Sequence, residues 1–182
     1  MNGILKGVRP LDYVLAGLMT VTGALLMYEN IAAGPDAELA HPLSTQSWLI
    51  MPAFVLVTLP VLWRRRNVNA VIGVTALATL AHVLAFGWIT RCGVELPLTL
   101  ALAYAVARFA GAARNHVIGL AGVLVVQLLV LVRDASIDTV AGTLPLTVPA
   151  AALFYGIGLF VQNRASKKQA AAVPPAIEHV AA

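Results

Sequence analysis

The sequence has little charge and a single cysteine. Of its 182 residues, 11% are charged and 60% are apolar, and the mean hydropathy is +0.86. An ordinary soluble domain is about a quarter charged and just under half apolar. This scarcity of charge excludes a disordered chain and a nucleic-acid-binding domain, and the lone Cys92 excludes an intrachain disulfide framework. The composition indicates a polytopic membrane protein.

Signatures of catalysis are also missing. The sequence contains no GxxxxGK[ST] phosphate loop, no GxSxG nucleophile elbow and no HExxH or CxxC spacing for a metal. We therefore expect a non-enzymatic protein without a metal or other cofactor.

Long apolar runs take the place of these motifs. A helix that spans a membrane needs about 20 mostly apolar residues, and six segments meet this requirement: 11–28, 47–63, 68–90, 94–110, 116–132 and 140–161. Helices satisfy their own backbone hydrogen bonds in lipid. The sequence thus predicts an all-α fold, a bundle of six transmembrane helices over residues 1–164, followed by a disordered cytoplasmic tail over 165–182.

The basic residues predict the orientation of this bundle. With six spans, ten of the 12 lysines and arginines fall on one side and only Arg91 and Arg133 on the other. Cytoplasmic loops carry an excess of basic residues, so we expect a multi-pass plasma-membrane protein with both termini in the cytoplasm. Among the basic groups, the Arg64, Arg65 and Arg66 cluster is expected to bind the headgroups of anionic lipids.

Ionisable and amide side chains within or beside the spans are candidates for ligand binding or sensing. His82 lies in the third span, Glu95 at the start of the fourth, Gln127 in the fifth and His41 in the first outer loop. The three in or beside the spans have a structural alternative. His82 and Gln127 could hydrogen-bond a neighbouring helix, and Glu95 could stabilise the positive end of its own helix.

Small residues recur at four-residue spacing in the fourth span, at Ala103, Ala107 and Gly111. Such a row lets two helices approach closely. It indicates either tight packing inside the bundle or an interface with another copy or another membrane protein.

Four short motifs resemble the N-terminal membrane domain of actinobacterial sensor histidine kinases of the NarL-partner type. They are Arg9-Pro10-Leu11-Asp12, the Leu59–Arg66 helix end, Ala103–Arg108 and the Gly158–Arg164 exit. In that family the last helix continues into a dimerisation helix with a phospho-acceptor histidine and an ATP-binding domain. Here 18 residues follow Arg164, and their one histidine, His179, lacks the surrounding pattern. We expect no kinase activity from this chain itself.

The resemblance implies a sensory or regulatory membrane module of a two-component system, or an accessory subunit of a membrane complex. Its expected partners are the lipid bilayer and either a second copy or another membrane protein. A small transporter or channel is the alternative, motivated by His82, Gln127 and Glu95. A lipid-modifying enzyme using Arg108, Arg114 and His116 at the cytoplasmic face is a third hypothesis, and Asp12 is the one carboxylate that could accompany them.

Overall fold

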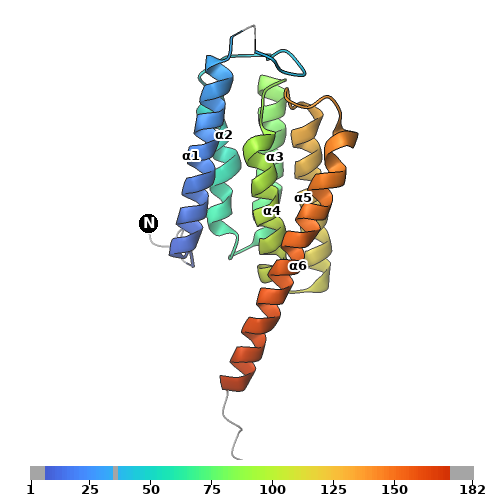
Figure 1. The fold of residues 1–182 in the computed structure, drawn as a ribbon. Helices are drawn as coiled ribbons and strands as arrows, with labels where there is room; N and C mark the ends of the chain where they lie inside the picture. Colours follow the sequence, from blue (N-terminus) through green and yellow to red (C-terminus); the bar gives the residue numbers. More distant parts are fainter. Residues whose placement is uncertain (1–6, 35–36, 173–182) are drawn as a thin grey trace, which may run out of the picture.

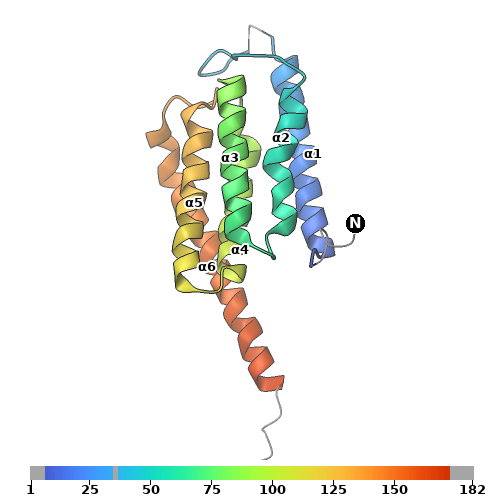
Figure 2. The ribbon, with the colours of Figure 1, turned by 180° about the vertical axis from the view of Figure 1, so that it is seen from behind.

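A computed structural model describes residues 7–34 and 37–172, and in this part of the chain the regular structure is helical. Figures 1 and 2 show an elongated bundle of helices that run alternately up and down. The elements are α1 (Pro10–Ala32), α2 (Ile50–Thr58), the 3₁₀ helix η1 (Leu59–Trp63), α3 (Val68–Phe86), α4 (Cys92–Phe109), α5 (Ala113–Val132) and α6 (Val140–Ala172). The predicted all-helical fold is confirmed for the described residues.

The helices form two pairs on either side of a central pair. α1 and α2 lie on one side of α3 and α4, and α5 and α6 lie on the other (Figures 1 and 2). α6 packs mainly on α4, and α5 packs on α3 and α4. Figure 1 shows the α1–α2 connection at one end of the bundle, which we call the loop end. The turn at Arg64–Arg66 lies at the opposite end, which we call the basic end.

Apolar side chains occupy both the interior and the outer surface. The core includes Phe54, Leu98 and Leu102, which are at most 1% exposed. Many large aliphatic side chains face outward as well, among them Leu77 and Leu84 on α3, which are 68% and 75% exposed. An outer surface this apolar is unfavourable in water and suits the hydrocarbon of a membrane.

Five of the helices are long and apolar enough to cross a membrane: α1, α3, α4, α5 and α6. The second predicted span, 47–63, folds instead as α2 followed by η1, over Ile50–Trp63. Pro60 sits at the start of η1 and has no N–H to continue the α-helical hydrogen bonds. Nine α-helical and five 3₁₀ residues rise about 23 Å, less than the roughly 30 Å of a bilayer core.

α6 is longer than the sequence predicts. It has 33 residues and continues to Ala172, so the expected disorder is wrong for 165–172. Residues 173–182 of the predicted tail lie outside the described residues. The extension is explained by composition, because Ala165 to Ala172 contain mostly strong helix formers and no proline. Adding residues to an existing helix also avoids the cost of nucleation. Figures 1 and 2 show this last part of α6 projecting beyond the other helices at the basic end.

Candidate functional site

The loop end of the bundle contains a buried cluster of polar side chains. They come from α1, α3, α4, the segment just before α4 and the connection between α5 and α6, and none is more than 3% exposed. We call this group the Arg91 cluster; its members are Asn30, Thr79, His82, Arg91, Glu95 and Asp134. Two predicted site residues, His82 and Glu95, thus lie in one cluster.

Arg91 is at the centre of the cluster. Its Nε donates to Nδ1 of His82 at 3.1 Å, Nη1 donates to the Arg133 carbonyl at 2.9 Å, and Nη2 donates to the Gly87 and His82 carbonyls at 2.8 and 3.3 Å. Burial lowers the pKa of Arg91 to about 10, while the Glu95 and Asp134 carboxyls oppose this shift. The guanidinium therefore stays charged near neutral pH.

These bonds determine the tautomer of His82. A guanidinium can only donate, so Nδ1 of His82 must accept the bond from Arg91. The ring proton then lies on Nε2, which faces the Ile50 carbonyl at 3.3 Å. His82 is also packed between the rings of Phe54 and Phe86. The imidazole consequently links α3 to the start of α2 and to the segment before α4.

A sharp turn brings Arg91 back against His82. Gly87 ends α3 with φ +61°, a conformation that favours glycine. Asn30 holds the same segment to α1, because its side chain both donates to the Thr90 carbonyl at 3.0 Å and accepts from the Thr90 N–H at 2.9 Å. The cluster thereby connects α1, α3 and α4.

Asp134 joins the start of α4 to the segment that leads into α6. Its Oδ2 accepts the backbone N–H groups of Arg91 and Cys92, each at 2.7 Å, which satisfies two donors at the start of α4. Its Oδ1 accepts from both the backbone and the hydroxyl of Ser136. The carboxylate also lies at the positive end of the α4 dipole. Since α6 begins at Val140, this contact ties the segment that precedes α6 to the start of α4.

Glu95 is the member of the cluster with unused hydrogen-bonding capacity. It lies in the first turn of α4 and is fully buried. Oε2 accepts from the Thr79 hydroxyl at 2.8 Å, whereas Oε1 has no partner among the described residues. Within the described chain its carboxyl also makes no ion pair with Arg91. An unpaired carboxylate oxygen in an apolar interior is costly, so Glu95 is the group best placed to take up a proton or a donor from a ligand.

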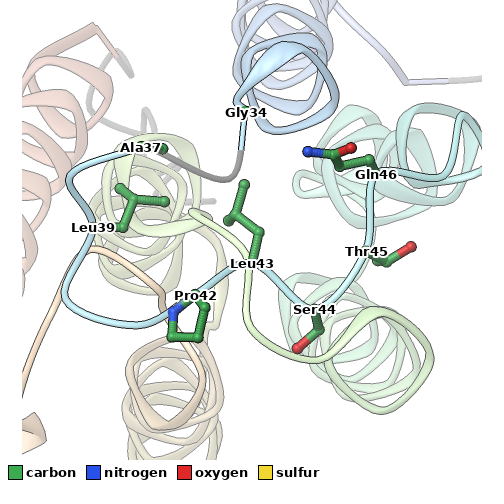
Figure 3. A pocket seen from close by; sticks show the side chains of 8 residues that line it. All are labelled: Gly34, Ala37, Leu39, Pro42, Leu43, Ser44, Thr45 and Gln46. Carbon is green, nitrogen blue, oxygen red and sulfur yellow. The ribbon is translucent and has the colours of Figure 1, made fainter.

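The α1–α2 loop covers the loop end. The ring of His41 stacks on Trp88 with centroids 4.0 Å apart, and the His41 N–H donates to the Ala135 carbonyl at 2.9 Å. Ser44 exchanges two hydrogen bonds with the backbone of Trp88, at 2.8 and 2.9 Å. Beside these contacts the loop encloses a hollow of about 540 Å³, and Figure 3 shows Leu43 pointing across it. His41 therefore lies in the covering loop rather than among the buried side chains.

Gln127 lies apart from the cluster. Its Nε2 donates to the Thr99 hydroxyl at 3.1 Å and to the Thr147 carbonyl at 3.3 Å. These contacts tie α5 to α4 and α6, which is the structural alternative that its position in the sequence left open.

The small residues of α4 divide between two environments. Ala103 and Ala107 are at most 3% exposed within the single chain. An added Cβ at Gly158 of α6 would lie only 2.6 Å from the Cβ of Ala107, so this part of the row packs α4 closely against α6. Gly111 lies beyond the end of α4, in the turn before α5. Ala103 and Ala107 therefore pack inside the bundle, which is the first of the two roles predicted for this row.

The three clustered arginines differ in their contacts. Arg64 and Arg65 bind the fully buried Asp12 of α1, with N–O distances of 2.9 and 2.7 Å, and Asp12 also accepts the Arg9 N–H at 3.0 Å. Arg66 is exposed. Two of the residues predicted to bind lipid headgroups thus hold α1 to the end of η1.

Several important residues were not singled out from the sequence. Arg91 and Asp134 were counted only as loop charges, and Asn30 and Thr79 were not considered. One signal was available, since Arg91 is one of only two basic residues on the acidic side of the predicted membrane.

Comparisons with known proteins identify no relative. No protein-family model, curated protein or solved structure matches the chain. Within residues 7–34 and 37–172, no three His, Cys, Asp or Glu side chains are grouped so that they could hold a metal ion.

Proposed function

We propose that this chain is a non-enzymatic membrane module that senses a condition at its loop end and transmits it through α6 to a partner. In this proposal the loop end faces the outside of the plasma membrane, and the basic end faces the cytoplasm. The positive-inside rule supports this orientation, because the basic residues gather at one end of the bundle: the Arg64–Arg66 turn precedes α3, Arg108 lies at the end of α4, Arg114 at the start of α5 and Arg164 in the last part of α6. In this proposal α2 and η1 together cross the membrane as the second of six spans, despite their short length.

One observation carries the proposal. The Arg91 cluster binds the segment that leads into α6, and α6 then runs the length of the bundle and beyond it. With 33 residues, α6 is about 50 Å long, compared with roughly 30 Å for a membrane core. A continuous helix of this kind is suited to carry a movement from the loop end into the cytoplasm. The resemblance to sensor-kinase membrane domains agrees with this arrangement.

The contacts support a route of transmission from the loop end to α6. Occupation of the free Oε1 of Glu95 would change the first turn of α4, whose N–H groups are held by Asp134. Because α6 also packs along α4, at Ala107 and Gly158, a small shift of α4 is passed on at both ends of the interface. The part of α6 beyond the bundle is then the surface that a second copy or another membrane protein would read.

A photo-crosslinking experiment on the full chain in native membranes tests this function. A photoreactive amino acid at Lys167, an exposed position of α6 beyond the bundle, should yield one discrete adduct, with a second copy or another protein. The same group at the exposed Leu84 of α3 is the control and should yield none. Glu95→Gln should change the yield of the Lys167 adduct at least threefold. Glu29→Gln alters an exposed carboxyl at the loop end, where Glu95 also lies, and should leave that yield unchanged. Absence of an adduct, or a yield indifferent to Glu95→Gln, contradicts the proposal.

A small transporter or channel is the second candidate, and the unpartnered Oε1 of Glu95 is the observation that favours it. A buried carboxyl that can exchange a proton is a common element of proton pathways. The interior between the Arg91 cluster and the basic end weakens this candidate, because its buried ionisable groups end with the cluster, and the buried side chains below it are apolar, as at Leu98 and Leu102, or uncharged, as at Thr75 and Thr99.

A flux assay separates the two candidates. The chain reconstituted in liposomes with an internal pH-sensitive dye should show no proton, sodium or small-solute movement above the protein-free leak. Flux that Glu95→Gln abolishes would establish the transporter and overturn the sensory module.

A further inference from the structure

The outer surface carries an apolar groove between η1 and α3, at the basic end. Two hollows of about 400 and 480 Å³ adjoin each other and share Pro60, Trp63 and Val74. Further lining residues include Arg66, Asn67, Ala70, Leu77 and Ala78. We call this the η1–α3 groove. Small side chains on α3 make it concave, at Ala70 and Ala78, and the apolar walls are exposed, with Val74 at 52% and Leu77 at 68%.

The groove has the length of one membrane leaflet. Along α3 it extends from Asn67 to Ala78, which corresponds to a rise of about 16 Å. Half of a typical bilayer core is about 15 Å. A groove that starts at the basic end and stops near mid-membrane matches a single acyl chain of the adjacent leaflet. Trp63 lines it near the basic end, at a depth where tryptophan is enriched in membrane proteins.

The end of the groove at the membrane surface is electropositive. Arg66 and Asn67 line it there. Asn67 is the N-cap of α3, with its side chain accepting the Ala70 N–H at 3.1 Å, so the positive end of the α3 dipole lies at the same place. Arg66 is exposed, whereas Arg64 is buried and Arg65 is half-buried.

We propose that the η1–α3 groove is a binding site for one anionic phospholipid of the adjacent leaflet. One acyl chain would lie along Val74 and Leu77, and the phosphate would lie beside Arg66 and the start of α3. The occupant is specified by the geometry: an apolar channel of one-leaflet length that ends at a cation. The inference requires the membrane location but not the sensory role, so it stands or falls separately from the crosslinking at Lys167.

Lipid titration followed by native mass spectrometry tests the site on the full chain. The probes are dioleoylphosphatidylglycerol and dioleoylphosphatidylcholine, which share acyl chains and differ in charge. The first phosphatidylglycerol should bind about fivefold more tightly than the first phosphatidylcholine, as expected for one basic residue near an anionic headgroup. Arg66→Gln should remove this preference. Arg114→Gln is the matched control, because Arg114 is exposed at the same end but does not line the groove, and it should retain the preference.

A second pair of variants tests the apolar channel. Val74→Trp fills the groove from an exposed position and should reduce the occupancy of the first lipid of either kind at least fivefold, while Leu84→Trp, elsewhere on α3, should not. Circular dichroism establishes that all variants fold. Equal binding of the two lipids by the unaltered chain, or lipid binding unaffected by Val74→Trp, would overturn the proposal. A lipid-free dimer that Val74→Trp dissociates would overturn it too, since the groove would then be a contact between copies.

Discussion

Removing the Asp134 carboxylate should strongly destabilise the loop end. Asp134 is fully buried and accepts four hydrogen bonds: from the N–H groups of Arg91 and Cys92 and from the N–H and hydroxyl of Ser136. In Asp134→Ala the N–H groups of Arg91 and Cys92, at the start of α4, lose the carboxylate oxygen that accepts their hydrogen bonds. The exposed Ser136 can turn to water, but the Arg91 N–H is buried with the rest of that residue.

The size of the effect follows from these groups. Loss of a helix N-cap acceptor costs about 0.5–2 kcal/mol, and each buried donor left unpaired costs about 1–3 kcal/mol. The buried Arg91 cation also loses a nearby negative charge. Together these predict a loss of about 3–5 kcal/mol for Asp134→Ala. Asp134→Asn keeps one acceptor oxygen, so about half of that loss is expected.

Thermal unfolding in mild detergent, followed by size-exclusion chromatography, measures the loss. A chain of this length shifts its Tm by about 2–4 °C per kcal/mol, so Asp134→Ala should lower the Tm by roughly 6–20 °C. Asp138→Ala, an exposed carboxylate in the same connection, should lower it by no more than about 2 °C. Equal Tm values for the two alanine variants would refute the role assigned to Asp134.

Three further predictions use the same measurement of Tm. Glu95→Gln should change the free energy of unfolding by less than about 1 kcal/mol, because the amide oxygen can keep the bond from the Thr79 hydroxyl and no ion pair is lost. A large fall in Tm would mean that the charge of Glu95 itself is required. Asp12→Ala should cost about 3–5 kcal/mol, because it leaves two arginines at a buried site without their anion. A loss as small as that of the exposed Glu29→Ala would contradict the role of this ion pair. Gly158→Ala should destabilise the protein by about 1–3 kcal/mol, because the added methyl group collides with α4. Gly156→Ala is the control: its methyl group enters open space, so this substitution should be neutral or stabilising. The same change in Tm at both glycines would show that α4 and α6 are not in close contact.

The helices themselves were predictable because their signal is local. Each apolar segment satisfies its backbone hydrogen bonds within itself, so hydropathy and length suffice to locate it. Five of the predicted spans correspond to long apolar helices. The remaining one, the second span at 47–63, corresponds to α2 and η1. The departures arise where local chemistry changes. Pro60 replaces the end of one α-helix by a 3₁₀ helix, and Ala165 to Ala172 extend another beyond its apolar part.

The candidate site was only partly predictable. His82 and Glu95 were recognised because a titratable group among apolar residues is conspicuous in a sequence. Their connection through Arg91 was not recognised, because the arginine stands at the boundary of a span, where a basic residue is ordinary. Asp12 and its two arginines were missed as a buried ion pair for the same reason, since each looks like an interfacial charge when read alone.

The sequence by itself determined the class of this protein, the positions of its helices and the asymmetry of charge between its two ends, because these depend on residues close together in the chain. Only the tertiary structure decided which polar groups meet. Asp134 lies 43 residues from Arg91 along the chain, yet holds its backbone N–H at 2.7 Å. The reason is physical: the burial of a charge is compensated by donors and acceptors brought together from separate helices, and only the packing of those helices determines which ones they are.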